Sequence, residues 1–562
     1  MEGREEYSEI EIFMVYKSVN KALESSFRTN WEHEALSNYQ GVTLCYKDVA
    51  RRIKHLHINF RECGLQKGDK VALCARNQVN WAISFLATLT YGAVPVPILH
   101  EFKPGNIHYL VNHSDAKVLF VDEVIWEGLS ESEMPGLYVI VQMNTLKYLY
   151  ARDESLKEVR NNLPDTFANE FPGGFSPKDI DYYEDSPEEL ALINYTSGTS
   201  GFSKGVMIPY RALAANLNLG SFAEPQMNCE SEVVAMLPSA HMYGMMFELL
   251  YEMTIGAHVH FLTRVPSPKV ILNACADIKP DIIIAVPLVI EKVYKSQLKP
   301  VLDKNKMYLS LPVVDRMIMK RIRGKLIDAF GGRFEEVILG GAAFNPEVEK
   351  ALRMLHFPFT VGYGMTECAP IITYEKWYKN KMFSCGKAIP GCEIRIDSPD
   401  PLTVPGEVQV RGDNLFLGYY KNEEASALAF TEDGWFRTGD MGVIDNDGYL
   451  FLKGRSKCMI LGPSGQNIYP EELECVINNL NYVVDSLVLE DKGTLMALIY
   501  PDYHTAEING ISREQLENRL RDLLPEVNKQ LPNYAQIKRI EFMPEDFERT
   551  PKKSIKRYLY QR

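Results

Sequence analysis

One glycine- and hydroxyl-rich stretch, residues 195–205, has the composition of a phosphate-binding loop. It reads Tyr-Thr-Ser-Gly-Thr-Ser-Gly-Phe-Ser-Lys-Gly, with three glycines, five hydroxyl side chains of Ser or Thr, and Lys204. Glycines let the backbone approach a ligand closely, hydroxyl and N–H groups donate to phosphate oxygens, and the lysine adds a positive charge. Because Gly205 rather than Ser or Thr follows the lysine, the stretch differs from the usual P-loop. We interpret it as a cradle for nucleotide phosphates, with a flexible surface loop as the alternative.

Two further stretches have residues that suit the rest of a nucleotide. Gly340 to Ala343 follow an apolar run, where small residues would let a flat purine lie against the backbone. Close packing of a helix on a strand is the alternative. Tyr363 can stack on a base, Thr366 can contact a phosphate, and Glu367 can hold a magnesium ion. A glycine-rich turn beside a buried tyrosine would have the same pattern.

Three more segments have side chains that suit binding or catalysis. Asp440, in the turn-like segment 434–440, can accept hydrogen bonds from both hydroxyls of a ribose, or it can simply cap the turn. His241 follows an apolar run and can polarise a substrate carboxylate, although a lone histidine there is more often part of a core. The basic tail, residues 549–557, can supply a cation to a transition state or form a solvated face.

The pattern of the surrounding chain changes twice. Between residues 42 and 340, helix-like segments alternate with short apolar runs at 70–74, 116–121, 232–237, 281–286 and 336–340. This alternation predicts parallel sheets covered by helices. After about residue 391, short alternating runs such as 406–412 predict antiparallel strands. From about residue 457 a compact α+β module is expected, which places the domain boundary at residues 454–457.

Composition and charge restrict the class of protein. A chain of 562 residues, 46% of them apolar, is expected to form more than one domain. The net charge of −13 argues against a nucleic-acid-binding protein, which needs a basic surface. Ten scattered cysteines without a CxxC pair indicate reduced thiols in a cytoplasmic protein. The charged start lacks the apolar core of a signal peptide, and glycine and proline interrupt the apolar run 81–98, so no transmembrane segment is predicted.

In order and spacing, six segments resemble the core motifs of the adenylate-forming (ANL) superfamily, and the resemblance extends over nearly the whole chain. The segments are 195–205, 340–343, 362–367, 434–440, 454–457 and 549–557. Residues 289–333 and 384–391 look most like the AMP-forming long-chain fatty acyl-CoA synthetases.

The resemblance implies an α/β fold with three parts. A large N-terminal ATP- and acyl-binding domain, residues 1–454, would contain helix-flanked, mostly parallel sheets and a small distorted β-barrel. Residues 455–457 would form a hinge, and residues 458–562 a small, mobile α+β domain.

The resemblance also implies a two-step reaction. A fatty-acid carboxylate of medium or long chain attacks the α-phosphorus of ATP to give acyl-AMP and pyrophosphate, and the thiol of coenzyme A then displaces AMP. Free carboxylates do not acylate thiols, because hydroxide is a poor leaving group, whereas AMP is a good one. The protein is therefore expected to work mainly by positioning the reactants and neutralising charge.

Each motif has a role implied by the resemblance. The β- and γ-phosphates would be bound by Thr196, Ser197, Gly198, Thr199, Ser200, Gly201 and Lys204, and the adenosine by Gly341, Ala342, Ala343, Tyr363, Gly364, Asp440 and Arg455, with Asp440 on the ribose. Thr366 would contact the α-phosphate, Glu367 would bind Mg²⁺, and His241 would lie near the reacting carboxylate. Lys457 would be the hinge about which the small domain swings, and Gly465 would belong to the loop that enters the site for the thiol step.

The tail departs from the family pattern at Ser554, where relatives have a lysine that reaches ATP and the carboxylate. In an extended segment Lys552 and Lys556 would project to the same side as Ser554, and a one-residue bulge would bring Lys553 into place. We therefore expect one of these catalytic candidates to replace the missing lysine. The alternative is a nucleotide-binding relative without catalytic activity.

The thiol acceptor and the acid each leave a choice open. The core motifs do not distinguish CoA from the thiol of an acyl carrier protein. An amino or aryl acid could replace the fatty acid, but the apolar residues 242–247 beside His241 favour an acyl chain. The basic and aromatic C-terminus, residues 556–562, can touch an anionic membrane surface, although a solvated tail is the simpler interpretation.

Overall fold

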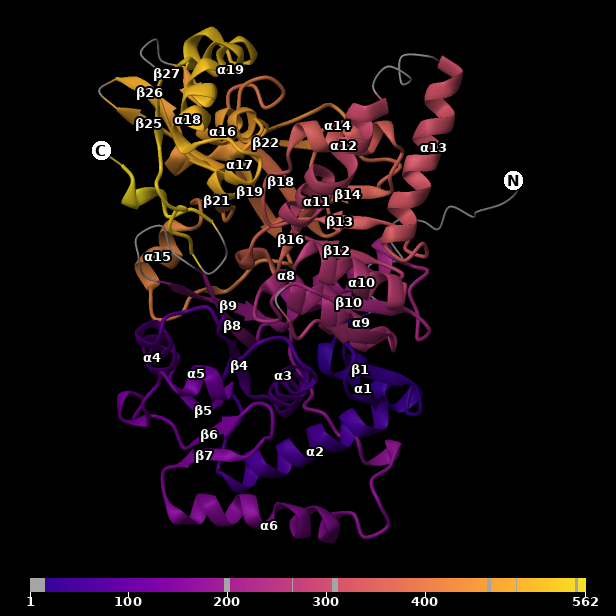
Figure 1. Ribbon diagram of the computed structural model, residues 1–562. Helices are drawn as coiled ribbons and strands as arrows, with labels where there is room; N and C mark the ends of the chain where they lie inside the picture. The colour runs from indigo at the N-terminus through magenta and orange to yellow at the C-terminus, as the bar shows by residue number, and fades with distance from the viewer. Residues whose placement is uncertain are drawn as a thin grey trace.

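The computed structural model describes residues 16–196, 203–264, 266–305, 312–461, 466–491, 493–550 and 554–561 (Figure 1). Within these ranges the chain forms a mixed α/β structure with parallel and antiparallel sheets, which confirms the fold class predicted from the sequence. In Figure 1 the N-terminal elements lie at the bottom and the C-terminal module, in yellow, lies at the top left.

A five-stranded sheet forms the first layer of the N-terminal region. Its strands are β3 (Lys70–Cys74), β4 (Val94–Pro97), β5 (Ala116–Val121), β6 (Val139–Gln142) and β7 (Tyr148–Ala151). The order is β4-β3-β5-β6-β7, and all neighbours are parallel except β6 and β7. The apolar runs at 70–74 and 116–121 are therefore strands of a parallel sheet, as predicted.

Two further sets of parallel strands carry the remaining apolar runs. One sheet has the order β10-β11-β1-β2 and the other the order β12-β13-β14, and a parallel bridge between Val233 and Ile282 connects them. All neighbours are parallel except β1 and β2. The strands are β1 (Glu34–Asn38), β2 (Thr43–Cys45), β10 (Glu232–Ala235), β11 (His258–Phe261), β12 (Ile283–Ala285), β13 (Val337–Leu339) and β14 (Phe359–Val361).

Helices connect and cover these strands, as the alternating pattern predicts. In chain order they are α1 (Val19–Thr29), α2 (Tyr46–Glu62), α3 (Val79–Tyr91), α4 (Pro104–His113), α5 (Glu123–Trp126), α6 (Glu154–Glu170), α7 (Tyr210–Ala223), α8 (Met242–Met245), α9 (Tyr251–Ile255), α10 (Pro268–Ile278), α11 (Pro287–Val293), α12 (Lys299–Asn305), α13 (Pro312–Ala329) and α14 (Pro346–Met354). Two π-helical segments, η4 (Met246–Leu250) and η5 (Tyr294–Leu298), continue α8 and α11.

The apolar run 81–98 is a buried helix followed by a strand, as predicted. It forms most of α3 and then β4, and nearly all of its side chains are buried. Gly92 ends the helix in the left-handed region with a φ of 82°, and a Cβ atom there would lie 2.8 Å from the ring of Tyr183. Among the described residues, no helix has the length and apolar character needed to cross a bilayer.

The N-terminal region also contains three antiparallel sheets. They have the orders β20-β9-β8, β15-β16-β17 and β18-β19-β21-β22. Their strands are β8 (Leu190–Thr196), β9 (Lys204–Pro209), β15 (Tyr363–Gly364), β16 (Ile371–Tyr374), β17 (Lys387–Ala388), β18 (Cys392–Asp397), β19 (Gly406–Gly412), β20 (Gly418–Tyr419), β21 (Phe436–Ile444) and β22 (Leu450–Arg455), with helix α15 (Glu423–Leu428) after β20. Antiparallel strands beyond residue 391 are thus confirmed.

The hairpin of β8 and β9 differs from the prediction, because it lies in the part of the chain expected to form parallel sheets. Its two strands are antiparallel, with Thr196 opposite Lys204. The connection between them, residues 197–203, is too short for the crossover of a dozen or more residues that parallel neighbours require. The glycine-rich stretch therefore joins two adjacent strands instead of a strand and a helix.

The C-terminal module has its own buried clusters. It contains β23 (Ile460–Leu461), β24 (Asn467–Ile468), α16 (Pro470–Asn478), β25 (Val483–Asp491), β26 (Thr494–Pro501), α17 (Tyr503–Ile508), α18 (Arg513–Asp522), α19 (Leu524–Gln530) and β27 (Ile537–Phe542). Its clusters lie between Ile468 and Phe547, whereas the large N-terminal cluster lies between Val19 and Leu450. The boundaries 1–454, 455–457 and 458–562 and the mobility of the small domain remain predictions.

Two polar contacts join the C-terminal end of α16 to the N-terminal region. The Lys295 ammonium donates to the main-chain oxygen of Asn478 at 2.9 Å, and the Asn345 side-chain amide donates to that of Asn479 at 2.6 Å. Both contacts involve exposed or partly buried polar groups. Such groups can exchange their partner for water, so this contact suits a domain that moves.

Burial of Glu252 on α9 predicts a pH-dependent stability. The side chain is almost fully buried, and burial raises its pKa from 4.5 to about 8. Between these two values the folded protein holds a proton that the unfolded chain has lost, so the free energy of unfolding falls as pH rises. Glu252→Gln should remove this fall. The change that the substitution causes in the free energy of unfolding should be more favourable at pH 8 than at pH 4.5 by on the order of 4 kcal/mol.

Urea unfolding of both proteins between pH 4.5 and 8 measures this difference. The exposed Glu424→Gln on α15 is the control and should leave the pH dependence unchanged. A Glu252→Gln protein whose unfolding free energy follows that of the wild type at every pH would contradict the prediction.

Candidate functional site

The β8–β9 hairpin holds the two ends of the glycine-rich stretch. Thr196 ends β8 and Lys204 begins β9, and the two residues face each other. The Tyr195 hydroxyl lies 2.7 Å from Nδ1 of His113 on α4, which anchors the end of β8. The Lys204 ammonium lies 4.4 Å from the centroid of the Tyr419 ring. The lysine is therefore fixed over an aromatic face at the base of the stretch.

The same tyrosine connects this lysine to the predicted magnesium ligand. The Tyr419 hydroxyl donates to Oε1 of Glu367 at 3.0 Å, and burial raises the pKa of the phenol, which keeps it a donor. Glu367 lies in the short 3₁₀ turn η7 (Thr366–Cys368), and its main-chain oxygen accepts from the N–H of Phe416 at 2.9 Å. Carboxylate oxygens are ligands that Mg²⁺ prefers, so Glu367 fits the expected ion.

Tyr363, Asp440 and Arg455 form a second polar cluster. The Tyr363 hydroxyl donates to Oδ2 of Asp440 at 2.6 Å, and Nε of Arg455 lies 2.8 Å from Oδ1. Asp440 on β21 and Arg455 on β22 are paired across two antiparallel strands, which explains their contact. Asp440 is 7% exposed, and burial raises its pKa, although Arg455 and Tyr363 counteract this shift.

Arg455 links the two clusters. Burial lowers its pKa, but interactions with Asp440 first, and then with Tyr363, Glu367 and Glu471, together raise it by more. One guanidinium is thus close to both the predicted ribose ligand and the predicted magnesium ligand. Residues from four of the segments that carry the family resemblance lie together here, and their roles in binding ATP remain predictions.

Gly341, Ala342 and Ala343 lie directly after β13, and all three are exposed. Gly341 has a φ of 84°, a backbone conformation that favours glycine. The preceding Gly340 lies against the ring of Tyr243, where a Cβ atom would approach a ring carbon to 3.2 Å. An exposed backbone with small side chains of this kind can accept a purine ring.

His241 lies where β10 leads into α8. It caps that short helix, because its Nδ1 accepts from the N–H of Tyr243 at 3.3 Å. The Asn194 side chain of β8 donates to the main-chain oxygen of Ala240 at 2.9 Å, which ties this turn to the hairpin. His241 is therefore held near the base of the glycine-rich stretch.

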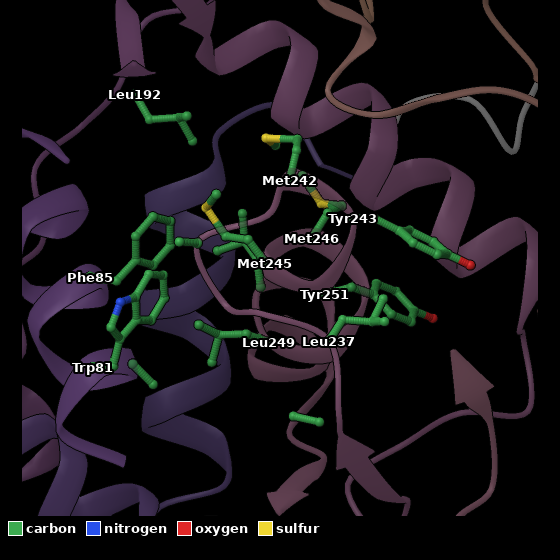
Figure 2. Packing of buried hydrophobic residues seen from close by; sticks show 14 of the residues in the cluster. Trp81, Phe85, Leu192, Leu237, Met242, Tyr243, Met245, Met246, Leu249 and Tyr251 are labelled. Atoms are coloured by element: carbon green, nitrogen blue, oxygen red, sulfur yellow. The ribbon is translucent and has the colours of Figure 1, made fainter. Parts of the chain in front are cut away.

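Beside His241, buried methionines form an apolar cluster. Figure 2 shows Met242, Met245 and Met246 packed together with Trp81 and Phe85 of α3 and with Leu192 of β8. The chain here changes from α-helix to the π-helical segment η4. π-helical turns are rare in proteins, and those that occur are often found at functional sites. Methionine side chains are flexible, so this cluster can adapt to an apolar ligand.

Gly364, another predicted ATP-binding residue, is required by the backbone itself. It pairs with Ile371 between β15 and β16, and a Cβ atom at this position would lie 2.0 Å from the main-chain oxygen of Pro370. Gly364→Ala should therefore lower the free energy of unfolding by about 3 kcal/mol, measured by urea denaturation. Gly324→Ala on α13, where a Cβ atom meets nothing within 4 Å, should instead stabilise by about 1 kcal/mol. Equal effects of both substitutions would contradict this argument.

The basic tail forms a short hairpin. Arg549 bridges to Ile555, and the N–H of Thr550 donates to the main-chain oxygen of Ser554 at 2.8 Å. The Lys556 ammonium lies 2.6 Å from Oε2 of Glu548. The ion pair with Lys556, helped by the charge of Lys103 from the N-terminal region, lowers the pKa of Glu548. Lys556 is thus held by an ion pair within the tail.

The residue after Lys556 also has a fixed partner. The Arg557 guanidinium bonds to the buried carboxylate of Glu474 on α16. Burial raises the pKa of Glu474 to about 7, although Arg557 counteracts this shift. The base of the tail hairpin is therefore anchored on the C-terminal module.

Several predicted residues lie outside the described residues. These are Ser197, Gly198, Thr199, Ser200 and Gly201 of the glycine-rich stretch, Gly465 of the thiol-side loop, and Lys552 and Lys553 of the tail. The hinge candidate Lys457 lies in the exposed 3₁₀ turn η8 (Ser456–Cys458), directly after Arg455. Its role as a hinge stays a prediction.

Sequence reasoning missed Tyr419, which contacts both Lys204 and Glu367. Its position follows from the pairing of β20 with β9, which sets Tyr419 opposite Val206. The only local signal is an aromatic pair, Tyr419 and Tyr420, after a glycine. That signal is common in cores and does not by itself indicate a ligand site.

Comparisons with known proteins agree with these observations. The family model described as AMP-binding enzyme matches residues 23–420, and the model described as AMP-binding enzyme C-terminal domain matches residues 459–562. The long-chain-fatty-acid–CoA ligase FadD15 of Mycobacterium bovis is 26% identical over 486 residues, which cover 81% of this chain and 76% of that protein.

Solved structures have the same fold. The anthranilate CoA ligase AuaEII in complex with anthranoyl-AMP gives a TM-score of 0.76 at 19% identity, with 97% of each chain covered. The o-succinylbenzoate CoA synthetase MenE of Bacillus subtilis, in complex with ATP and magnesium, gives a TM-score of 0.73 at 20% identity, with 96% of this chain and 98% of that chain covered.

Proposed function

Because this chain belongs to the AMP-binding enzyme family, we propose that it is an AMP-forming acid–thiol ligase that activates a medium- or long-chain fatty acid with ATP and transfers it to CoA. The observation that carries this proposal is the meeting of two polar clusters at Arg455. One contains Lys204, Tyr419 and Glu367, and the other contains Tyr363 and Asp440. Cation, carboxylates and aromatic ring match the phosphates, ribose and base of ATP.

In the first step an oxygen of the fatty-acid carboxylate attacks the α-phosphorus of ATP, and the bond to pyrophosphate breaks. Lys204 and the glycine-rich stretch bind the β- and γ-phosphates, and Thr366 contacts the α-phosphate. Glu367 would hold a magnesium ion, which when bound neutralises part of the phosphate charge. Asp440 accepts from the ribose hydroxyls, and Tyr363 and the backbone of 341–343 lie against the adenine.

In the second step the CoA thiol loses its proton and its sulfur attacks the acyl carbon, so that AMP leaves and a thioester forms. We propose that the C-terminal module turns about Lys457 between the two steps and brings the loop of Gly465 to the site. The contacts of α16 with Lys295 and Asn345 suit such a movement, since these polar groups can exchange their bonds for water when the module turns.

The choice of a fatty acid rests on the cluster of methionines beside His241. These side chains are buried, apolar and flexible, and they lie next to the turn that positions the histidine. The name of the Mycobacterium relative, a long-chain-fatty-acid–CoA ligase, supports the same choice. The anthranilate and o-succinylbenzoate enzymes show that related folds act on other acids, so chain length is a property to be measured.

The proposal also covers the cellular compartment and the thiol acceptor. All ten cysteines are free thiols, which suits an enzyme of the reducing cytoplasm. An acyl carrier protein is the second candidate for the thiol acceptor, because the clusters described here bind the nucleotide and not the acceptor. A nucleotide sensor without catalysis is the second candidate function, since Ser554 stands at the expected lysine position and Lys556 is paired with Glu548.

The test is pyrophosphate release from ATP and magnesium with acids from acetate to oleate, each with CoA, with an acyl carrier protein, or with neither. We expect release with a limited range of chain lengths and its stimulation by CoA. Stimulation by the carrier protein alone would correct the acceptor. Binding of ATP without release for any acid would replace the ligase by the nucleotide sensor.

A further inference from the structure

We propose that Glu232, His258 and His260 form a binding site for a structural Zn²⁺ ion, remote from the nucleotide site. The three ligand atoms, a carboxylate oxygen and two imidazole nitrogens, lie within 4.8 Å of one another. Two histidines and a carboxylate are among the donor sets that zinc prefers, with metal–ligand distances of about 2.0–2.2 Å.

The strand geometry directs these side chains to one place. His258 and His260 are two residues apart on β11, so both point to the same face of the sheet. Glu232 on β10 pairs with His258 in parallel register. Its Oε2 lies 3.1 Å from Nδ1 of His258 and 2.6 Å from Nε2 of His260. A tetrahedral zinc ion needs these atoms about 3.3–3.6 Å apart, so ion binding would separate the carboxylate oxygen from both nitrogens by side-chain rotation.

The buried histidine offers an unused nitrogen to this site. His258 is 5% exposed, and its Nδ1 makes no hydrogen bond, although it lies beside Oε2 of Glu232. A buried polar nitrogen without a hydrogen bond is costly, and a metal ion would satisfy it. The carboxylate of Glu34 on β1 lies 3.5 Å from the same nitrogen and can supply a further oxygen ligand.

The other nitrogen of His258 has the partner that a zinc ligand needs. Its Nε2 lies 2.7 Å from Oγ of Ser37, which in turn lies 2.7 Å from Oγ1 of Thr43. A proton on Nε2 donated to Ser37 leaves Nδ1 as the free acceptor, which is the tautomer required for metal binding. Such outer contacts orient ligating histidines in metal sites.

The position of the site indicates a structural role. Glu232 and His258 are the first residues of β10 and β11, whereas His241 follows the opposite, carboxyl end of β10. The ion would therefore connect the amino ends of two parallel strands, at the edge of the sheet opposite to His241. Glu232 and His260 remain partly exposed, at 29% and 16% of their side chains, so an ion can reach them from solvent.

The experiment is a calorimetric titration of the full-length, chelator-treated protein with Zn²⁺ in the absence of ATP. We expect one equivalent bound with a dissociation constant of about 10 μM or tighter, and a weakening of at least about tenfold in His260→Gln and in Glu232→Gln. The exposed His504→Gln is the matched control and should bind as the wild type does. Zinc should also raise the melting temperature of the wild type by about 2–4 °C and leave that of His260→Gln unchanged.

Crystals soaked in Zn²⁺ locate the ion directly by its anomalous scattering. Scattering density between Glu232, His258 and His260 supports the proposal. Wild-type protein that binds Zn²⁺ more weakly than about 10 μM overturns it, and so does equal affinity in His260→Gln and His504→Gln. Pyrophosphate release by zinc-free His260→Gln should equal that of the wild type, so failure of this site leaves the proposed ligase activity untouched.

Discussion

Alanine at both Lys552 and Lys553 should lower the rate of pyrophosphate release by about 10³-fold, whereas alanine at Lys556 should change it by less than about threefold. Removing one donor that stabilises a developing charge costs about 10²–10³ in rate, and removing a cation that contacts a transferring phosphoryl group costs up to about 10⁵. In the tail this chain has Ser554 where the family has a catalytic lysine. Removing the lysine that takes over its role should therefore have the largest effect of any substitution we predict.

Contacts of the described tail distinguish these lysines. The Lys556 ammonium is paired with Glu548, and the next residue, Arg557, is paired with Glu474. These pairs fix the base of the hairpin. Lys552 and Lys553 connect Thr550 to Ser554, whose main chains are bonded to each other, and both lie outside the described residues. A residue already engaged in an ion pair is a poor candidate for a cation that must move to the substrate.

Steady-state and single-turnover pyrophosphate release with the best fatty acid measures this effect. Single replacements of Lys552 and Lys553 then identify which lysine carries it, and ATP affinity should change far less than the rate. Lys529→Ala on α19, paired with Glu526 on the surface, controls for loss of charge from the module. A Lys556→Ala protein as inactive as the double variant would show that the Glu548 pair opens during the reaction and would refute the assignment.

The apolar pattern of the sequence predicts strands close to several of the proposed nucleotide-binding residues, since Thr196 ends β8, Gly341 follows β13 and Arg455 ends β22. Asp440 and Arg455 meet because a hairpin turn at 445–448 pairs β21 with β22, and that turn is visible in the sequence. The contact of Tyr363 with Asp440 needs the whole fold. The resemblance to a family assigns both residues to the adenosine but does not predict that they touch.

Contacts between distant strands could not be predicted in the same way. Tyr419 reaches Lys204 because β20 adds to the edge of the β8–β9 hairpin, and nothing local marks that pairing. The pattern of His258 and His260 shows that both face one side of a strand. Their carboxylate partner Glu232 depends on the order of strands in the sheet, which periodicity does not determine.

Asp440→Ala should lower kcat/KM for ATP by about 10²–10³, the second large effect that we expect. A hydrogen bond to a charged group contributes about 1.5–3 kcal/mol, and in the proposed complex Asp440 accepts two of them from the ribose. The substitution also leaves the buried hydroxyl of Tyr363 without its acceptor. The half-exposed guanidinium of Arg455 can turn to water, so most of the loss should concern ATP and not folding.

Discrimination between ATP and 2′-deoxy-ATP separates a ribose contact from a general loss of structure. The wild type should bind 2′-deoxy-ATP about tenfold more weakly or worse, and Asp440→Ala should bind both nucleotides equally, as measured by calorimetry. Asp433→Asn is the matched control, since Asp433, in the turn before β21, forms a surface ion pair with Arg395 of β18 in the same sheet. It should keep both the affinity and the discrimination. If Asp440→Ala still distinguishes the two nucleotides, another group binds the 2′-hydroxyl, and Asp440 serves only to hold Tyr363 and Arg455 together.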